Sequence, residues 1–267
     1  MKKAFIYLMV FMGLQVGVTA VVMLIMRLTG VSGDPSADSL IISMAASSIV
    51  AGAVFLIARW GRVSRDYVRS RPWGVLFWCV LASVGMVIPS TWLQEKLPEL
   101  PDMLGSQFAM ILKNRYGYYV VGLLVPVVEE LVFRGAILRA LLAGFKKHWI
   151  AIAVSALLFA LVHGNPAQMP HALIAGMLLG WMYYRTGSIV PGVAYHWVNN
   201  TIAYILYNIL PDPNVPLIVI FNGDGRAVLA SVLFSLCILL PSIYQLNIRM
   251  KRADGGKPAV QDISGGV

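Results

Sequence analysis

The sequence predicts an all-α fold, a polytopic membrane helix bundle of about eight transmembrane helices with both termini on the cytoplasmic side. Two features of its composition support this class. Of 267 residues, 58% are hydrophobic and 12% are charged, and the mean hydropathy is +0.75, which is typical of multi-pass membrane proteins. A third observation is the recurrence of apolar runs of about 20 residues, the length at which a helix crosses a bilayer.

The apolar runs define the predicted spans. The fifth and sixth runs are short and are separated by Gly164-Asn165-Pro166 and Pro170. This pair is therefore expected to be broken or re-entrant, which is possible where backbone lines a protein-walled cavity. Residues 94–115 are expected to form a non-cytoplasmic loop with an interfacial helix. The eight predicted spans cover residues 4–26, 38–58, 73–93, 117–138, 149–163, 171–184, 188–209 and 226–248.

The basic residues determine the predicted orientation. With the N-terminus inside, thirteen Lys and Arg flank the cytoplasmic span ends and five flank the opposite ends, as the positive-inside rule requires. The net charge of +9 is spread between the apolar runs, so nucleic acid is not indicated as a partner. Lys2 and Lys3 precede an apolar run that is longer than a signal-peptide core, so residues 4–26 are expected to remain as the first span.

The most unusual stretch places charges inside a predicted span. Glu129, Glu130 and Arg134 lie in a segment that is otherwise apolar enough to cross a bilayer, and charges at that depth usually mark function. Glu130 and Arg134 have the i, i+4 spacing of a helical ion pair. Glu129 points about 100° away around the helix. We therefore interpret Glu130–Arg134 as a structural pair and Glu129 as the available carboxylate.

Two later spans carry further polar groups. Phe159 and His163 share one helix face, as do His196 and Asn200, because four residues separate the members of each pair. The estimated depths of these groups are compatible with one cavity that also holds Glu129. A carboxylate beside two imidazoles and a carboxamide is suited to hydrolysis, with the glutamate as general base and neutral donors at the oxyanion. No function is assigned to His148 or His171.

At these residues the sequence resembles the CPBP family of intramembrane proteases, which includes type II CAAX prenyl endopeptidases and lysostaphin-resistance-like proteins. The motif Glu-Glu-x-x-x-Arg matches residues 129–134, Phe-x-x-x-His matches 159–163 and His-x-x-x-Asn matches 196–200. The resemblance covers about residues 116–206. It implies that Glu129 and His163 activate water, that His196 and Asn200 form the oxyanion site, and that Glu130, Arg134 and Phe159 support them.

The resemblance implies a lipid bilayer and a peptide or membrane-protein substrate as partners, in a single helical domain of residues 1–252 with a protease-like core at 116–206. Residues 253–267 are expected to be a disordered cytoplasmic tail. The chain shows no added soluble domain, which favours a bacterial plasma membrane. The substrate stays open among a prenylated CAAX peptide, a bacteriocin leader and a lipidated or transmembrane peptide.

The sequence leaves open two alternative functions and the presence of a metal. The chain could be a non-catalytic membrane immunity or scaffold protein of the same fold, or a proton-coupled carrier with Glu129 and the histidines as a relay. Glu129, His163 and His196 could hold a catalytic zinc as a His₂Glu set. A metal-independent glutamate mechanism is slightly favoured, because the histidines lie on separate helices and Asn200 is a poor zinc ligand.

Overall fold

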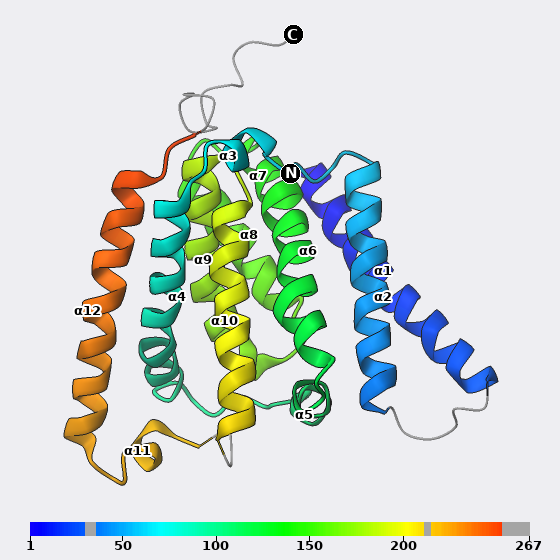
Figure 1. Cartoon of the computed structure of the whole chain (residues 1–267). Coiled ribbons are helices and arrows are strands. Elements are labelled where there is room, and N and C mark those ends of the chain that lie inside the picture. The colour runs from blue at the N-terminus through cyan, green and yellow to red at the C-terminus, as the bar shows by residue number, and fades with distance from the viewer. Residues whose placement is uncertain (30–35, 211–214, 253–267) are drawn as a thin grey trace.

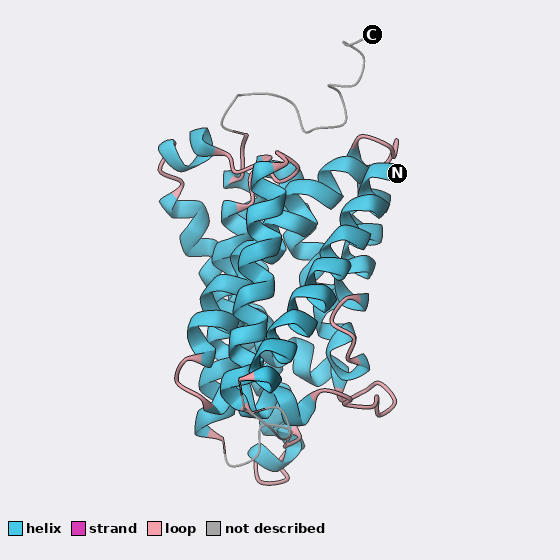
Figure 2. Ribbon diagram, turned by 90° about the vertical axis from the view of Figure 1, so that its right-hand side faces the viewer, coloured by secondary structure: helices cyan, strands magenta, loops and turns pink. Residues whose placement is uncertain are grey.

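The computed structural model describes residues 1–29, 36–210 and 215–252, and every regular element in these ranges is helical (Figures 1 and 2). The long helices run side by side as a bundle, and the described part of the chain contains no strand. The all-α prediction is therefore confirmed. The tail predicted at 253–267 lies outside the described residues.

Helices occupy all eight predicted spans, with ends that agree to within a few residues. Four of them are long and apolar enough to cross a membrane: α1 (Lys2–Leu28), α2 (Ala37–Ile57), α4 (Trp73–Gln94) and α12 (Gly225–Arg249). The others are less uniformly apolar, shorter, or change helix type along their length. The number of crossings and their direction therefore stay predictions. These other elements are the composite column Tyr118–Leu142, α8 (His148–Leu161), α9 (Met169–Thr186) and α10 (Val190–Ile209).

Short helices close the two ends of the bundle. The short helix α3 (Arg65–Arg69) lies at the end that also holds the N-terminus and the last described turn of α12, and α5 (Gly105–Lys113) and α11 (Leu217–Ile220) lie at the opposite end (Figure 1). At the first end, a Cβ on Gly144 would lie 3.4 Å from the Met1 nitrogen, and one on Gly187 would lie 3.3 Å from Arg252 Cζ. The first and last described residues therefore lie at the same end of the bundle.

The column that carries the two glutamates is one continuous helix with two wide turns. It consists of the π-helix η1 (Tyr118–Leu124), α6 (Val125–Val132), the π-helix η2 (Phe133–Leu138) and α7 (Arg139–Leu142). Pro126 stands in the first turn of α6. Proline has no N–H and cannot donate to the carbonyl four residues earlier, so the widened η1 turn precedes it without a break in the helix. The glutamates thus lie on a short α-helical segment between two π segments.

Helices α8 and α9 pack closely because small residues face the contact. Gly176 and Gly180 are spaced i, i+4, and a Cβ on either would lie about 3 Å from Ala156 or Ile152 of α8. Small residues at this spacing let helix backbones approach in membrane proteins. Helix α8 has 14 residues and is thus about 21 Å long, short of a hydrocarbon core of about 30 Å. The chain turns at residues 162–168, inside the bundle.

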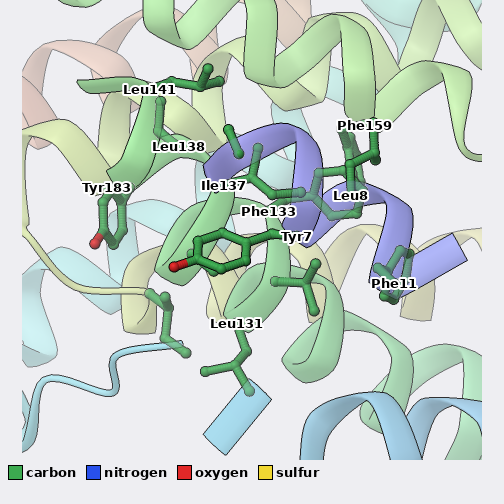
Figure 3. Close-up of a cluster of buried hydrophobic side chains, with 14 of the residues drawn as sticks. Tyr7, Leu8, Phe11, Leu131, Phe133, Ile137, Leu138, Leu141, Phe159 and Tyr183 are labelled. Atoms are coloured by element: carbon green, nitrogen blue, oxygen red, sulfur yellow. The ribbon is translucent and has the colours of Figure 1, made fainter. Parts of the chain in front are cut away.

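An aromatic core connects α1 to the centre of the bundle (Figure 3). The ring of Phe11 on α1 meets Phe133 at 5.6 Å between centroids, and Phe133 meets Phe159 of α8 at 5.1 Å, both edge to face. Phe133 and Phe159 are fully buried. This stack packs α1 against η2 and holds Phe159 in place beside the polar residues described next.

Candidate active site

Glu130 and Arg134 form the ion pair that their spacing predicts. Arg134 Nη1 donates to Glu130 Oε1 at 2.7 Å, and both residues have no exposed surface. Arg134 Nη2 also donates to the Gly176 carbonyl at 3.3 Å, and its guanidinium lies 4.4 Å from the centroid of the Phe159 ring. The pair therefore ties α6 and η2 to both α8 and α9, and a buried charge is compensated on each side.

His196 of α10 lies between the two glutamates. Its Nδ1 is 3.4 Å from Glu130 Oε1, and its Nε2 is 3.7 Å from Glu129 Oε2. The Nδ1 contact lies within ion-pair range but does not meet hydrogen-bond geometry, so Nδ1 has no hydrogen-bond partner in the described structure. Sequence spacing indicated a purely structural Glu130, whereas the geometry also places its carboxylate beside the imidazole of His196. Glu130 thus faces Arg134 and His196 with the same oxygen.

Glu129 differs from its neighbour in exposure and in partners. Its side chain is 18% exposed, against 0% for Glu130, and the basic side chain that approaches it within ion-pair range in the described structure is the imidazole of His196. A carboxylate with this access can exchange protons with water or substrate, which a fully enclosed one cannot. The expectation that Glu129 is the available carboxylate is consistent with this arrangement.

Gly192 of α10 leaves room for the buried carboxylate. A Cβ at this position would lie 2.5 Å from Glu130 Oε2, closer than real Cβ contacts. Gly192, His196 and Asn200 are spaced by four residues and share one face of α10. That face therefore combines a space for Glu130, the imidazole between the glutamates, and the carboxamide one turn further along.

Phe159 separates the two motif histidines. Its ring packs edge to face against His163 at 4.9 Å and against His196 at 5.8 Å. His163 Nδ1 lies 2.7 Å from the Phe159 carbonyl, and because a carbonyl accepts, Nδ1 donates. In a neutral imidazole, a proton on Nδ1 leaves Nε2 unprotonated and able to accept a proton. His163 makes no described polar contact with Glu129 or His196. It is linked to the site by the packing of the Phe159 ring and not by a hydrogen bond.

Asn200 lies one turn after His196 on α10 and contacts the helical column of the glutamates at its first π segment, η1. Its Nδ2 donates to the Val121 carbonyl in η1 at 2.9 Å. A carboxamide nitrogen has two N–H groups, so one remains for another acceptor. Asn200 thus contacts the widened turn of η1 directly, and this contact lies one helical turn or more before Glu129 along the same column.

Sequence reasoning missed a second set of polar residues that adjoins Asn200. His171 of α9 contacts Ser90 Oγ on α4 through Nδ1 and Asn199 Oδ1 on α10 through Nε2, both at 3.1 Å. Asn199 Nδ2 in turn donates to Asn200 Oδ1 at 3.3 Å. The sequence signal was weak, since His171 matches no motif spacing and its partners lie on two distant helices.

The described residues do not gather a three-donor metal set. No group of three or more His, Cys, Asp and Glu side chains within the described ranges is arranged to hold a metal ion. Glu129 and His196 approach each other, but His163 stands apart behind Phe159. The residues present do not fit a His₂Glu zinc site, so no chemical step is derived through a metal.

A cavity of about 820 Å³ lies at the end of the bundle opposite the N-terminus, away from all the motif residues. Its lining joins the end of α4, the following loop, α11 and the start of α12. It also includes Ala167 in the α8–α9 turn, whose carbonyl accepts from Gln94 at 2.8 Å. This cavity therefore reaches the turn that follows His163 but does not include the proposed reacting groups.

Comparison with family models finds one that covers the site. Residues 112–202 match the model described as Type II CAAX prenyl endopeptidase Rce1-like. This segment is similar to the Rce1-like family of CAAX proteases. Comparison with curated proteins gives no match, and comparison with solved structures gives none either.

The Rce1-like segment contains every motif residue predicted from the sequence. It also contains both partners of each contact described above, except for the contacts made by α1, α4 and the loops. The family consists of membrane-embedded CAAX-type endopeptidases, which agrees with a bundle that has four helices long and apolar enough to span a membrane. The outer helices α1, α2, α4 and α12 lie outside the matched residues.

Proposed function

We propose that this protein hydrolyses a peptide bond of a membrane-associated peptide, with a prenylated CAAX-type peptide as the first candidate substrate. The proposal joins the Rce1-like match to the geometry of Glu129. The observation that carries it is the contrast between two adjacent carboxylates: Glu130 is enclosed and paired to Arg134, whereas Glu129 is partly open and lies 3.7 Å from His196 Nε2.

In the proposed reaction, Glu129 removes a proton from a water molecule, and the resulting hydroxide attacks the scissile carbonyl carbon. The carbonyl oxygen becomes an oxyanion that the free N–H of Asn200 and an N–H of His196 stabilise. The tetrahedral intermediate then collapses as the C–N bond breaks. The proton held by Glu129 passes to the leaving amine, which restores the carboxylate and leaves a new carboxylic acid on the substrate.

The remaining motif residues prepare these groups. Glu130 lies beside His196 Nδ1, which favours a proton on that nitrogen and fixes the orientation of the ring. His163 has its unprotonated Nε2 available, so it can accept a hydrogen bond from the attacking water. Phe159 packs against both imidazoles and Arg134 holds the Glu130 carboxylate, so these groups keep their relative positions. We place the protein in a bacterial plasma membrane with both termini cytoplasmic, as the basic residues indicate.

The direct test replaces Glu129 by glutamine. Glu129→Gln keeps the size of the side chain but removes the proton acceptor, so cleavage of a farnesylated CAAX peptide by the purified protein should fall by about 10²- to 10⁴-fold. The thermal unfolding of the variant in detergent should match that of the unmodified protein.

The matched control is Glu99→Gln, a change of the same type at an exposed residue outside the site. It should leave turnover unchanged. Normal cleavage by Glu129→Gln would refute the proposed role of this carboxylate. Absence of cleavage by the unmodified protein across prenylated, lipidated and leader peptides would instead support a non-catalytic role for the fold.

Metal dependence has its own prediction. Because Asn200 is a poor zinc ligand and His163 is separated from Glu129 by Phe159, cleavage should survive dialysis against a chelator. The measurement is the residual rate together with elemental analysis of the dialysed protein. Loss of activity that returns on addition of one equivalent of zinc would identify His163 and His196 as ligands and would overturn the proposed mechanism.

A further inference from the structure

A chain of four polar side chains crosses three helices and ends at the proposed oxyanion donor. It begins at Ser90 of α4, continues through His171 of α9 and Asn199 of α10, and reaches Asn200. None of the four is exposed: Ser90 is 4% exposed and the others are half-buried. Inside a membrane bundle such groups need partners, and here each supplies one for the next.

The direction of the hydrogen bonds follows from a group that can only accept. The Val121 carbonyl accepts from Asn200, so Asn200 must present Nδ2 to it and Oδ1 to Asn199. Asn199 must then present Nδ2 to Asn200 and Oδ1 to His171. His171 Nε2 must therefore carry a proton, because an oxygen acceptor faces it. Each amide orientation is thus determined by its neighbour.

Ser90 completes the far end of the chain. Its hydroxyl donates to the Val87 carbonyl at 3.0 Å, and its oxygen lies 3.1 Å from His171 Nδ1. A hydroxyl has one proton and can rotate it, so Ser90 can give that proton to Nδ1 of a neutral His171 in place of Val87. The requirement for a proton on Nε2 comes from Asn199 Oδ1, on the other side of the ring.

We propose that His171 is a positioning residue that fixes the carboxamide of Asn200, through Asn199, so that its free N–H points at the oxyanion. This inference rests on the proposed function, because it concerns the orientation of a group in the proposed site. Without the proton on His171 Nε2, Asn199 Oδ1 loses its donor, and the Asn199 amide is held by Asn200 alone and can rotate. Asn200 Oδ1 then loses its donor, and the Asn200 amide is held by Val121 alone.

The kinetic test compares two substitutions of His171. His171→Ala removes the donor, and a displaced oxyanion donor should lower kcat for the farnesylated CAAX peptide by about tenfold or more with little change in KM. His171→Gln keeps a donor for Asn199 and an acceptor for Ser90, so it should recover most of the lost kcat. The control is His148→Ala, which changes a histidine at the start of α8 that stacks on Tyr184, far from His171. It should leave turnover unchanged.

A double-mutant cycle separates positioning from general packing. If His171 acts through Asn200, His171→Ala should have almost no further effect on kcat in an Asn200→Ala background, since interacting residues are not additive. Equal fold-losses in the two backgrounds, or a loss that follows only the unfolding temperature, would overturn the proposal.

A second measurement needs no turnover. In detergent-solubilised protein labelled with ¹⁵N at asparagine, Asn199→Asp and Asn200→Asp assign the two side-chain NH₂ signals. His171→Ala should shift both signals and His148→Ala neither, whereas an unchanged Asn200 signal in His171→Ala would refute the inference. Shifted signals in a protein that cleaves no peptide would leave the positioning supported and refute the proposed function.

Discussion

The glycines of the outer helix α1 and those of the inner helices α9 and α10 lie in different surroundings. The glycines of α1, Gly13 and Gly17, have nothing within 4 Å of a Cβ placed on them, whereas Gly176, Gly180 and Gly192 of α9 and α10 are closely packed. Helix α1 also exposes large apolar side chains along much of its length. A helix face that meets lipid needs only to be apolar, because lipid adapts to its surface. An inner helix must fit its neighbours, and the site depends on that fit.

The largest expected effect comes from an unpaired charge in the inner region. Arg134→Ala leaves Glu130 buried without its cation, which typically costs about 3–5 kcal/mol, so the unfolding temperature and the yield of folded protein should both fall. Thermal unfolding in detergent measures this. Arg27→Ala removes the same side chain from the exposed end of α1 and should have little effect. Unchanged stability of Arg134→Ala with a loss of turnover would make Arg134 a substrate or oxyanion ligand.

A smaller effect is expected from one added methyl group. Gly192→Ala places a carbon against Glu130 Oε2, and overpacking of this kind costs about 1–3 kcal/mol. The displaced carboxylate also loses its place beside His196, so cleavage should fall. Gly17→Ala, in open surroundings on α1, gains helix propensity and should be neutral or stabilising. If the two alanine variants unfold at the same temperature, the contrast between inner and outer glycines is wrong.

The last comparison uses two asparagine–aspartate pairs, one buried and one exposed, and the exposed pair should give the smallest effect. Asn165 donates to Asp102 Oδ1 at 2.7 Å and accepts from the Met103 N–H at 3.1 Å, and it is almost fully buried in the α8–α9 turn. Asn165→Ala should cost about 1–3 kcal/mol, because it leaves a loop N–H without its acceptor.

The exposed pair Asn114–Asp38 provides the comparison, with a 3.0 Å bond between α2 and the segment after α5. Asn114→Ala should cost less, since water replaces the lost partner. Unfolding by heat in detergent measures both variants. An equal loss for the two would show that burial of Asn165 contributes nothing to the stability of the turn.

The ends of the long helices could be predicted because apolar runs and loop residues mark them directly. The buried ion pair could also be predicted, since Glu130 and Arg134 are spaced by one turn of the same helix. The role of His171 could not, because its partner Ser90 is 81 residues away and packing of α4 on α9 brings them together. The approach of His196 to Glu130 required the same knowledge of how α10 lies against α6.

The two π segments around α6 also make the site sensitive to length. Each residue of an α-helix turns the chain by about 100°. Deletion of one residue within Tyr118–Leu124 would let η1 return to α-helical geometry, and the Val121 carbonyl would rotate relative to Glu129. The number of residues in a π segment therefore sets the angle between the helical segments on its two sides. For this column, a single-codon deletion is a harsher change than almost any substitution at the same positions.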